Sequence, residues 1–183
     1  MEDTGVFNVV KKFKWVFICI TILIAIILLI FVIGKSSNEN RLENYLQKHE
    51  YKNKNGVFYK TVTESGDMNS TINYIFSIKA NKFTKNIKNI YETIILKYDG
   101  TNDVEISYYS ESFSPNYYAI SQSATYNIKT KTFDCKILKA KGDYKLMCPR
   151  IKEEAIVFSG EINNIIKKAK INNLFTTKKS KKI

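Results

Sequence analysis

Histidine is nearly absent from this sequence of 183 residues, which contains a single one, His49. A hydrolytic Ser-His-Asp triad requires a histidine base, and a zinc site usually draws on several histidines or cysteines. No G-x-S-x-G, P-loop or G-x-G-x-x-G signature occurs either. We interpret His49 as a packed or partly exposed residue of a helix stripe. The composition therefore predicts that the chain is not an enzyme and holds no metal or cofactor.

Cysteine is scarce as well, and the three residues lie in different surroundings. Cys19 falls inside a long apolar run, where a free thiol behaves as a small hydrophobe. Cys135 lies on the inward side of a predicted strand, and Cys148 comes just before a predicted helix. In an oxidising compartment we expect these two to form a disulfide that stabilises the fold by about 3 kcal/mol. Two buried free thiols are the alternative, because a metal or redox pair would need a C-x-x-C spacing or histidine partners.

Acidic side chains are outnumbered, since 29 lysines and arginines face 17 aspartates and glutamates and give a net charge of +12. Leaving out the three lysines and two acids before residue 15 still leaves +11. A basic surface attracts anionic lipid headgroups, wall polymers, acidic proteins or nucleic acid. The competing explanation is an A/T-rich genome, which favours lysine, asparagine, isoleucine and tyrosine without any demand from function.

One long apolar run is present, from Trp15 to Gly34, and Thr21 alone interrupts it. As a helix, twenty residues extend about 30 Å, which matches the hydrocarbon core of a bilayer. A cleavable signal has a shorter apolar stretch, of about 7 to 15 residues, and ends in small residues. The sequence therefore predicts an uncleaved signal-anchor helix over residues 15–34, with a cleaved signal as the alternative.

The charges beside this run predict its orientation. Three lysines lie within residues 11–14, whereas Lys35 and Arg41 on the other side are interspersed with acids. Because lysine and arginine near a span resist translocation, the amino terminus is expected inside the cell. The prediction is a single-pass membrane protein with a cytoplasmic tail over residues 1–14 and an extracytoplasmic carboxy-terminal part.

The exported part is long enough for one domain, and its patterns change along the chain. Residues 35–56 predict a membrane-proximal amphipathic helix with Leu42, Tyr45, Leu46 and His49 on one stripe, ended by Asn55-Gly56. Alternating apolar residues then predict about six strands. We place these at 57–63, 72–79, 91–98, 104–111, 117–128 and 132–139. Hairpin turns are expected at Asp99-Gly100, within residues 110–116 and at residues 129–131.

Helical periodicity returns after Pro149, which suits the first turn of a helix. The apolar stripe comprises Ile151, Ala155, Phe158, Ile162, Ile165, Ile166 and Ala169. The predicted fold class is α+β, with an antiparallel meander sheet packed by an N-terminal and a C-terminal helix. The domain is expected over residues 57–172, followed by a basic disordered tail over 173–183.

Two features of the exported part are candidates for binding. Neighbouring strand residues face opposite ways, so we expect the rings of Tyr109 and Tyr117 to point outward on either side of a loop that contains Phe113. They would stack on a glycan or on a partner, although cross-strand aromatic packing is the competing explanation. The tail lysines would lie on an anionic surface, with a solvated tail as the alternative. These are Lys178, Lys179, Lys181 and Lys182.

Three functions from different classes are compatible with this layout. We favour a non-enzymatic binding or assembly protein at the cell envelope, whose partners are the bilayer and an anionic envelope polymer or membrane protein rather than nucleic acid. A subunit of a membrane secretion or conjugation machine is the first alternative, and it rests on layout alone. An envelope-acting inhibitor, immunity or exclusion factor is the second. The sequon Asn69-Ser70-Thr71 matters only in a eukaryotic secretory pathway.

Overall fold

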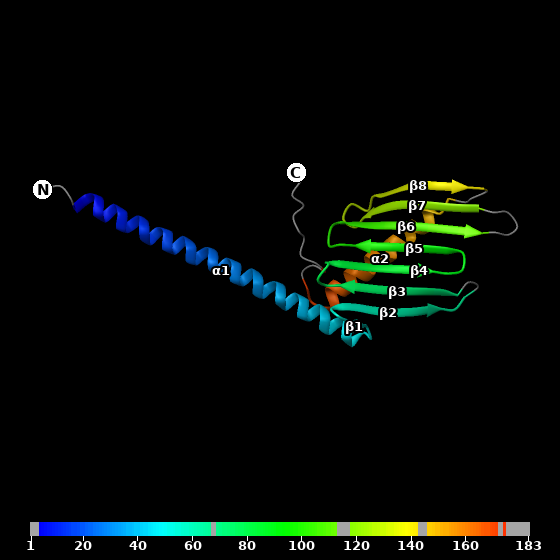
Figure 1. Cartoon of the computed structure of the whole chain (residues 1–183), viewed down its shortest axis with the longest axis horizontal. Coiled ribbons are helices and arrows are strands. Elements are labelled where there is room, and N and C mark those ends of the chain that lie inside the picture. The colour runs from blue at the N-terminus through cyan, green and yellow to red at the C-terminus, as the bar shows by residue number, and fades with distance from the viewer. Residues whose placement is uncertain (1–3, 67–68, 113–117, 143–145, 172–173, 175–183) are drawn as a thin grey trace. The chain divides into compact units, whose positions relative to one another are not determined.

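The computed structural model describes residues 4–66, 69–112, 118–142, 146–171 and 174. The chain divides into two compact units, residues 1–40 and residues 41–183, which are described separately. Figure 1 shows their helices and strands in chain order.

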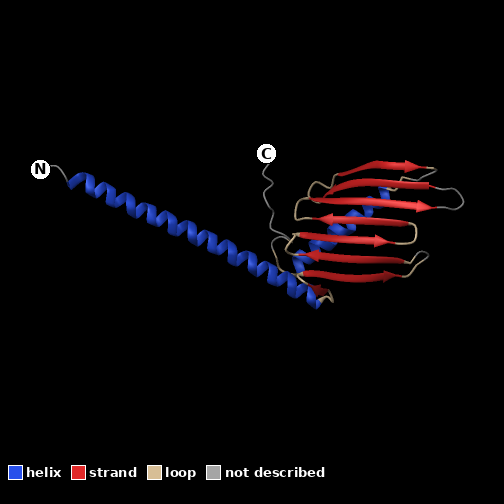
Figure 2. Ribbon diagram, viewed as in Figure 1, coloured by secondary structure: helices blue, strands red, loops and turns tan. Residues whose placement is uncertain are grey.

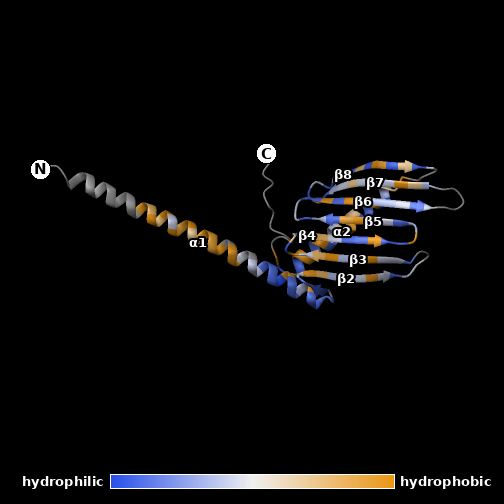
Figure 3. Cartoon of the chain, viewed as in Figure 1, coloured by the Kyte–Doolittle hydropathy of each residue, from blue (hydrophilic) through white to orange (hydrophobic). Residues whose placement is uncertain are grey.

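The first unit is helical throughout its described residues. Helix α1 (Thr4–Lys48) begins there and continues into the second unit. From Val16 onward it has an apolar window with a mean hydropathy of 3.6, none of which is buried. The hydroxyl of Thr21 donates to the carbonyls of Phe17 and Ile18, so the one polar side chain in this window is satisfied within the helix. Figure 3 shows the apolar middle of α1 and its hydrophilic end. By length and composition it is the one described helix able to cross a membrane.

The prediction of a separate helix over residues 35–56 was wrong at both ends. Helix α1 continues unbroken through residue 35 and ends at Lys48. Two of its last turns belong to the second unit, where Leu42 and Leu46 are fully buried, as the predicted stripe requires. Asn55 and Gly56 do not end the helix, because they form a two-residue hairpin turn in which both have positive φ. Asn-Gly is the preferred sequence of such turns.

The second unit contains an eight-stranded antiparallel sheet whose strands follow one another in chain order. Figure 2 shows these strands side by side. The predicted meander is confirmed, and the six predicted strands match six of the eight within about two residues. The strands are β1 (Lys52–Lys54), β2 (Val57–Glu64), β3 (Ser70–Ser77), β4 (Lys82–Lys88), β5 (Glu92–Tyr98), β6 (Asp103–Ser112), β7 (Tyr118–Asn127) and β8 (Phe133–Lys141).

The predicted count of six strands was too low, because β1 and β4 were missed. Strand β1 has three residues, all exposed, so it carries no apolar signal. Strand β4 does alternate, but the middle of its three inward positions is a lysine: Phe83, Lys85 and Ile87 are all buried. A charged residue at an inward position removes the apolar alternation by which a strand is recognised.

The core lies between one face of the sheet and helix α2 (Cys148–Lys168). In Figure 1, α2 runs across the strands behind the sheet. The predicted stripe is confirmed, since Ile151, Ala155, Phe158, Ile162 and Ile165 are buried. Aromatic rings stack in layers beneath it, with Phe76 and Phe83 centroids 3.6 Å apart. The other face of the sheet, called the open face here, has no helix over it among the described residues.

A disulfide joins Cys135 on β8 to Cys148 at the start of α2, as predicted. The fully buried side chain of Gln122 on β7 lies beside it. Its amide nitrogen donates to the Sγ atom of Cys148 at 3.2 Å, and its oxygen accepts from the backbone N–H of Met147. The bridge and the glutamine therefore fix the beginning of α2 against the last two strands.

Candidate functional site

The open face is mainly polar, and two exposed tyrosines lie on it, Tyr59 on β2 and Tyr109 on β6. Tyr108 and Tyr109 are neighbours on β6 and point to opposite faces, as the strand alternation predicts. Tyr108 is 3% exposed and lies in the core, whereas Tyr109 is 47% exposed. Its hydroxyl donates to the carboxylate of Glu111, two residues further along the same face. This hydrogen bond restricts the orientation of the ring.

The strand register places Tyr109 at the centre of a row of five side chains. Tyr109 is paired with Thr93 on β5 and with Ser121 on β7. Thr93 is paired in turn with Lys88 on β4, and Ser121 with Lys139 on β8. We call Lys88, Thr93, Tyr109, Ser121 and Lys139 the Tyr109 row. It crosses four gaps between strands, or about 19 Å, with a lysine at each end.

Hollows lie on both sides of the ring, and Tyr109 lines both. One, of about 600 Å³, is bordered by Lys88, Thr93, Glu111 and the β4–β5 loop. In this loop Ile90 is 80% exposed and Tyr91 is 45% exposed. The other, of about 210 Å³, is lined by Tyr109, Ala119, Ile120, Ser121, Lys139 and Lys141. The ring therefore separates two recesses that are flanked by lysines and hydroxyls.

Glu92 lines the larger hollow and connects its wall to the core and to α2. This carboxylate is buried, forms an ion pair with Arg150 of α2 and accepts the hydroxyl of Tyr108. The side-chain nitrogen of Asn89 donates to the same carboxylate, and its oxygen accepts hydrogen bonds from the backbone N–H groups of residues 91 and 92. The β4–β5 loop is thus tied to both the sheet and the helix, which gives the recess a fixed border.

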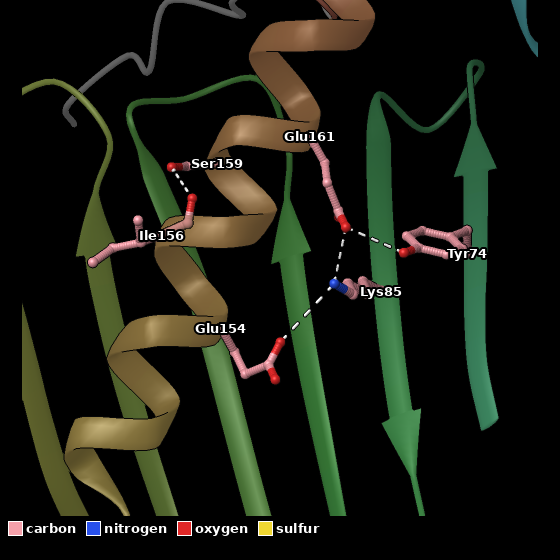
Figure 4. Close-up of polar contacts among 6 residues, drawn as sticks. All are labelled: Tyr74, Lys85, Glu154, Ile156, Ser159 and Glu161. Atoms are coloured by element: carbon pink, nitrogen blue, oxygen red, sulfur yellow. Dashed lines mark hydrogen bonds and ion pairs between the residues drawn. The ribbon is translucent and has the colours of Figure 1, made fainter. Parts of the chain in front are cut away.

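A second cluster of polar groups lies on the opposite face, under α2 (Figure 4). The Nζ atom of Lys85 is 3.0 Å from Glu161 and 3.9 Å from Glu154, and its side chain is 5% exposed. Tyr74 donates its hydroxyl to the same Glu161 oxygen at 3.2 Å. The lysine also lies 5.6 Å from the centre of the Tyr74 ring. A buried charge needs such partners, so the cluster explains how Lys85 is tolerated in the core.

Burial raises the pKa of two groups in this cluster, Glu154 and Tyr74. Burial raises the pKa of the Glu154 carboxyl above its ordinary value, although Lys85 opposes the shift. At 3.9 Å the attraction to Lys85 does not offset the loss of hydration. Burial also raises the pKa of Tyr74, and the charge of Glu161 adds to the effect. Tyr74 therefore remains a hydrogen-bond donor at all physiological pH values.

A hollow of about 300 Å³ adjoins Glu161 and includes His49 in its lining. His49 stacks on Tyr45, with ring centroids 4.0 Å apart, and its Nδ1 atom is 2.8 Å from the Tyr45 carbonyl. Lys60 donates to the His49 carbonyl and covers the ring of Tyr51. These contacts are within the fold, in line with the interpretation of His49 as a packed residue. Nowhere in the described ranges do three or more His, Cys, Asp or Glu side chains gather as metal ligands would.

The sequence-based candidates are only partly represented in this site. Tyr109 lies where the prediction put it, and its role in binding stays a prediction. Phe113, Tyr117 and the four tail lysines (Lys178, Lys179, Lys181 and Lys182) lie outside the described residues. Sequence reasoning missed the other four members of the Tyr109 row, because only the pairing register brings residues from five strands into line.

Comparison with protein-family models, with curated proteins and with solved structures found no match to this chain.

Proposed function

We propose that this chain is a single-pass membrane protein with a non-enzymatic binding role at the cell envelope. Residues 15–34 form an uncleaved anchor, residues 1–14 lie in the cytoplasm, and the unit of residues 41–183 lies outside. The open face of the sheet, around Tyr109, is the surface that binds.

Three observations support the proposed placement. The described side chains between Val16 and Ile30 are all exposed, and an apolar surface of that extent is unfavourable in water and typical of membrane contact. The unit that follows contains a Cys135–Cys148 disulfide, a bond that persists in oxidising compartments. The positive charge of residues 11–14 favours the same orientation.

The observation that carries the binding role is the half-exposed ring of Tyr109 between two recesses. Exposed aromatic side chains with restricted orientation are typical of binding surfaces, because they bury much area and lose little conformational entropy. The rest of the open face consists mainly of threonine, serine, asparagine and lysine, which hydrate well. Tyr59 is also exposed on this face but lines neither recess, so the recesses single out Tyr109 as the binding position.

Photo-crosslinking tests this proposal on the full chain in intact cells. A photoreactive amino acid replaces Tyr109 in one variant and Val157, which is 53% exposed on α2, in a matched control. We expect an envelope adduct from position 109 and none from position 157. Equal adducts from both positions, or none from position 109, would contradict the proposal.

The composition of the adduct distinguishes the candidate functions. A polymer, or one envelope protein, agrees with a binding or assembly role. A set of several membrane proteins from one complex would favour a subunit of a secretion or conjugation machine. One dominant foreign or secreted protein would favour an inhibitor, immunity or exclusion factor.

A further inference from the structure

We propose that the Tyr109 row binds a linear anionic carbohydrate-type polymer, whose hydroxyl groups alternate with acid groups such as phosphates. The polymer would lie across the strands, parallel to the row. This inference rests on the proposed function, since it takes the open face as the binding face and adds the chemical class of the ligand.

The centre of the row suits a sugar or polyol unit. Tyr109 offers the face of a ring that is held by its bond to Glu111, and such a face covers the C–H groups of a carbohydrate. Thr93 and Ser121 pair directly with Tyr109 on either side, so their hydroxyls flank the ring. Hydroxyl groups both donate and accept hydrogen bonds, as the hydroxyls of a polyol also do.

The ends of the row suit the acid groups of such a polymer. Lys88 and Lys139 are exposed, and they lie two strands away from Tyr109 in opposite directions. Lys141 lines the smaller recess as well. The acids that border the two recesses are Glu111, which accepts the Tyr109 hydroxyl, and Glu92, which is paired with Arg150. Three lysines, Lys88, Lys139 and Lys141, thus lie along the row against Glu111 and the Arg150-paired Glu92, an excess of positive charge that is complementary to a polyanion.

A peptide that adds as a ninth strand fits this region poorly. The register of β8 against β7 shifts between Ser121 and Gln122, so Leu138 is an extra residue opposite that point. Strand β8 also carries lysines at positions 136, 139 and 141. Irregular pairing and lysine side chains are the features by which edge strands resist addition of another strand. The side-chain row, rather than the strand edge, is thus the feature available to a ligand.

The test uses the full chain in nanodiscs of neutral lipid and measures affinity for three polymers. Poly(glycerol phosphate) carries polyol and charge, polyphosphate carries charge alone, and dextran carries carbohydrate alone. Single-stranded DNA serves as a fourth polymer, an anionic one that contains neither a polyol nor a free sugar chain. The variants are Lys88→Gln, Lys139→Gln and Tyr109→Ala, and the matched control is Lys152→Gln, an exposed lysine on α2.

We expect poly(glycerol phosphate) to bind more tightly than the other polymers. Lys88→Gln and Lys139→Gln should each lower this affinity about fivefold, and Lys152→Gln should leave it unchanged. Tyr109→Ala should weaken binding of poly(glycerol phosphate) and not of polyphosphate. Higher salt should weaken binding of the wild type more than of the lysine variants.

Several outcomes would overturn the inference while the proposed function survives. Equal losses in the row variants and in Lys152→Gln would remove the row as the site. Equal binding of polyphosphate or DNA, insensitive to Tyr109→Ala, would leave charge alone as the determinant. Dextran binding that is unchanged by Lys88→Gln and Lys139→Gln would show that the ligand need not be anionic. If no polymer binds while position 109 still crosslinks to a protein, the proposed ligand class is wrong and the open face remains the binding face. If no polymer binds and position 109 gives no crosslink, both proposals are wrong.

Discussion

At the scale of single residues, the most consequential side chain in the core is Lys85. It is 4% exposed and relies on Glu161, Glu154 and Tyr74. Replacing it with methionine would leave Glu161 beneath α2 without its cation. Because breaking a buried ion pair strands the remaining charge, we expect Lys85→Met to lower the free energy of unfolding by about 3 kcal/mol.

A control for this substitution lies three residues further along the same strand. Lys88 is exposed on the open face, so Lys88→Met should change the free energy of unfolding by less than about 0.5 kcal/mol. Both can be measured by denaturant unfolding of the full chain in detergent. Equal effects of the two substitutions would show that the cluster under α2 does not stabilise the fold.

The raised pKa of Glu154 predicts that the free energy of unfolding depends on pH. Its pKa is raised in the folded protein from an ordinary value of 4.5, so the folded state holds the proton to higher pH than the unfolded chain does. The free energy of unfolding then falls as pH rises from about 4.5 through the raised pKa. We expect Glu154→Gln to reduce this fall, and Glu153→Gln, the exposed neighbour, to leave it unchanged. A pH profile of Glu154→Gln identical to that of the wild type would contradict the assignment.

At the scale of elements, the same substitution at two glycines should have opposite effects. Gly56 has a φ of +78° in the β1–β2 turn, a conformation that a side chain disfavours. Gly160 lies in α2 with open space around an added Cβ atom. We expect Gly56→Ala to destabilise by about 1 kcal/mol and Gly160→Ala to stabilise by about 0.5 to 1 kcal/mol. Thermal unfolding of both variants gives the signs, and effects of the same sign would contradict this account of the turn.

The disulfide between Cys135 and Cys148 also stabilises the arrangement of elements. It joins two cysteines that are 13 positions apart in the sequence, one on β8 and one at the start of α2. Replacing Cys135 and Cys148 together with serine should lower the free energy of unfolding by about 3 kcal/mol, because the unfolded chain regains loop freedom. Cys19→Ser is the matched control, since that thiol is free. A double variant as stable as the control would show that Gln122 and the core packing suffice to hold α2.

The elements also show how far the sequence predicts this fold. Six strands, α2 and the disulfide follow from alternation, helical periodicity and cysteine placement. Strand β4 was missed because Lys85 occupies an inward position, and its compensation by Glu161 and Glu154 exists only in the folded chain. Asn55-Gly56 was assigned to a helix end because β1, three exposed residues, gave no sign of a strand before the turn.

At the scale of the whole molecule, the candidate site was less predictable than the fold. Alternation places Tyr109 on the outward face, but the row through Lys88 and Lys139 depends on the register of four consecutive strand pairs. Register is set jointly by the turns and the core, so no local pattern contains it. The long apolar helix, in contrast, was predictable from composition, since α1 has a continuous apolar window, and its insertion in a membrane stays a prediction.

The central claim is that an oxidised binding domain lies outside the cell, and thiol labelling on intact cells tests it most directly. In a Cys19→Ser background, Cys135 and Cys148 are the two remaining reporters, and both the reductant and the mass-tagging maleimide must be membrane-impermeant. The account predicts no tag before reduction and two tags after it, with denaturation added where the site is shielded. Thiols that react without reduction, and only after the cells are opened, would place the domain in the cytoplasm and contradict the account.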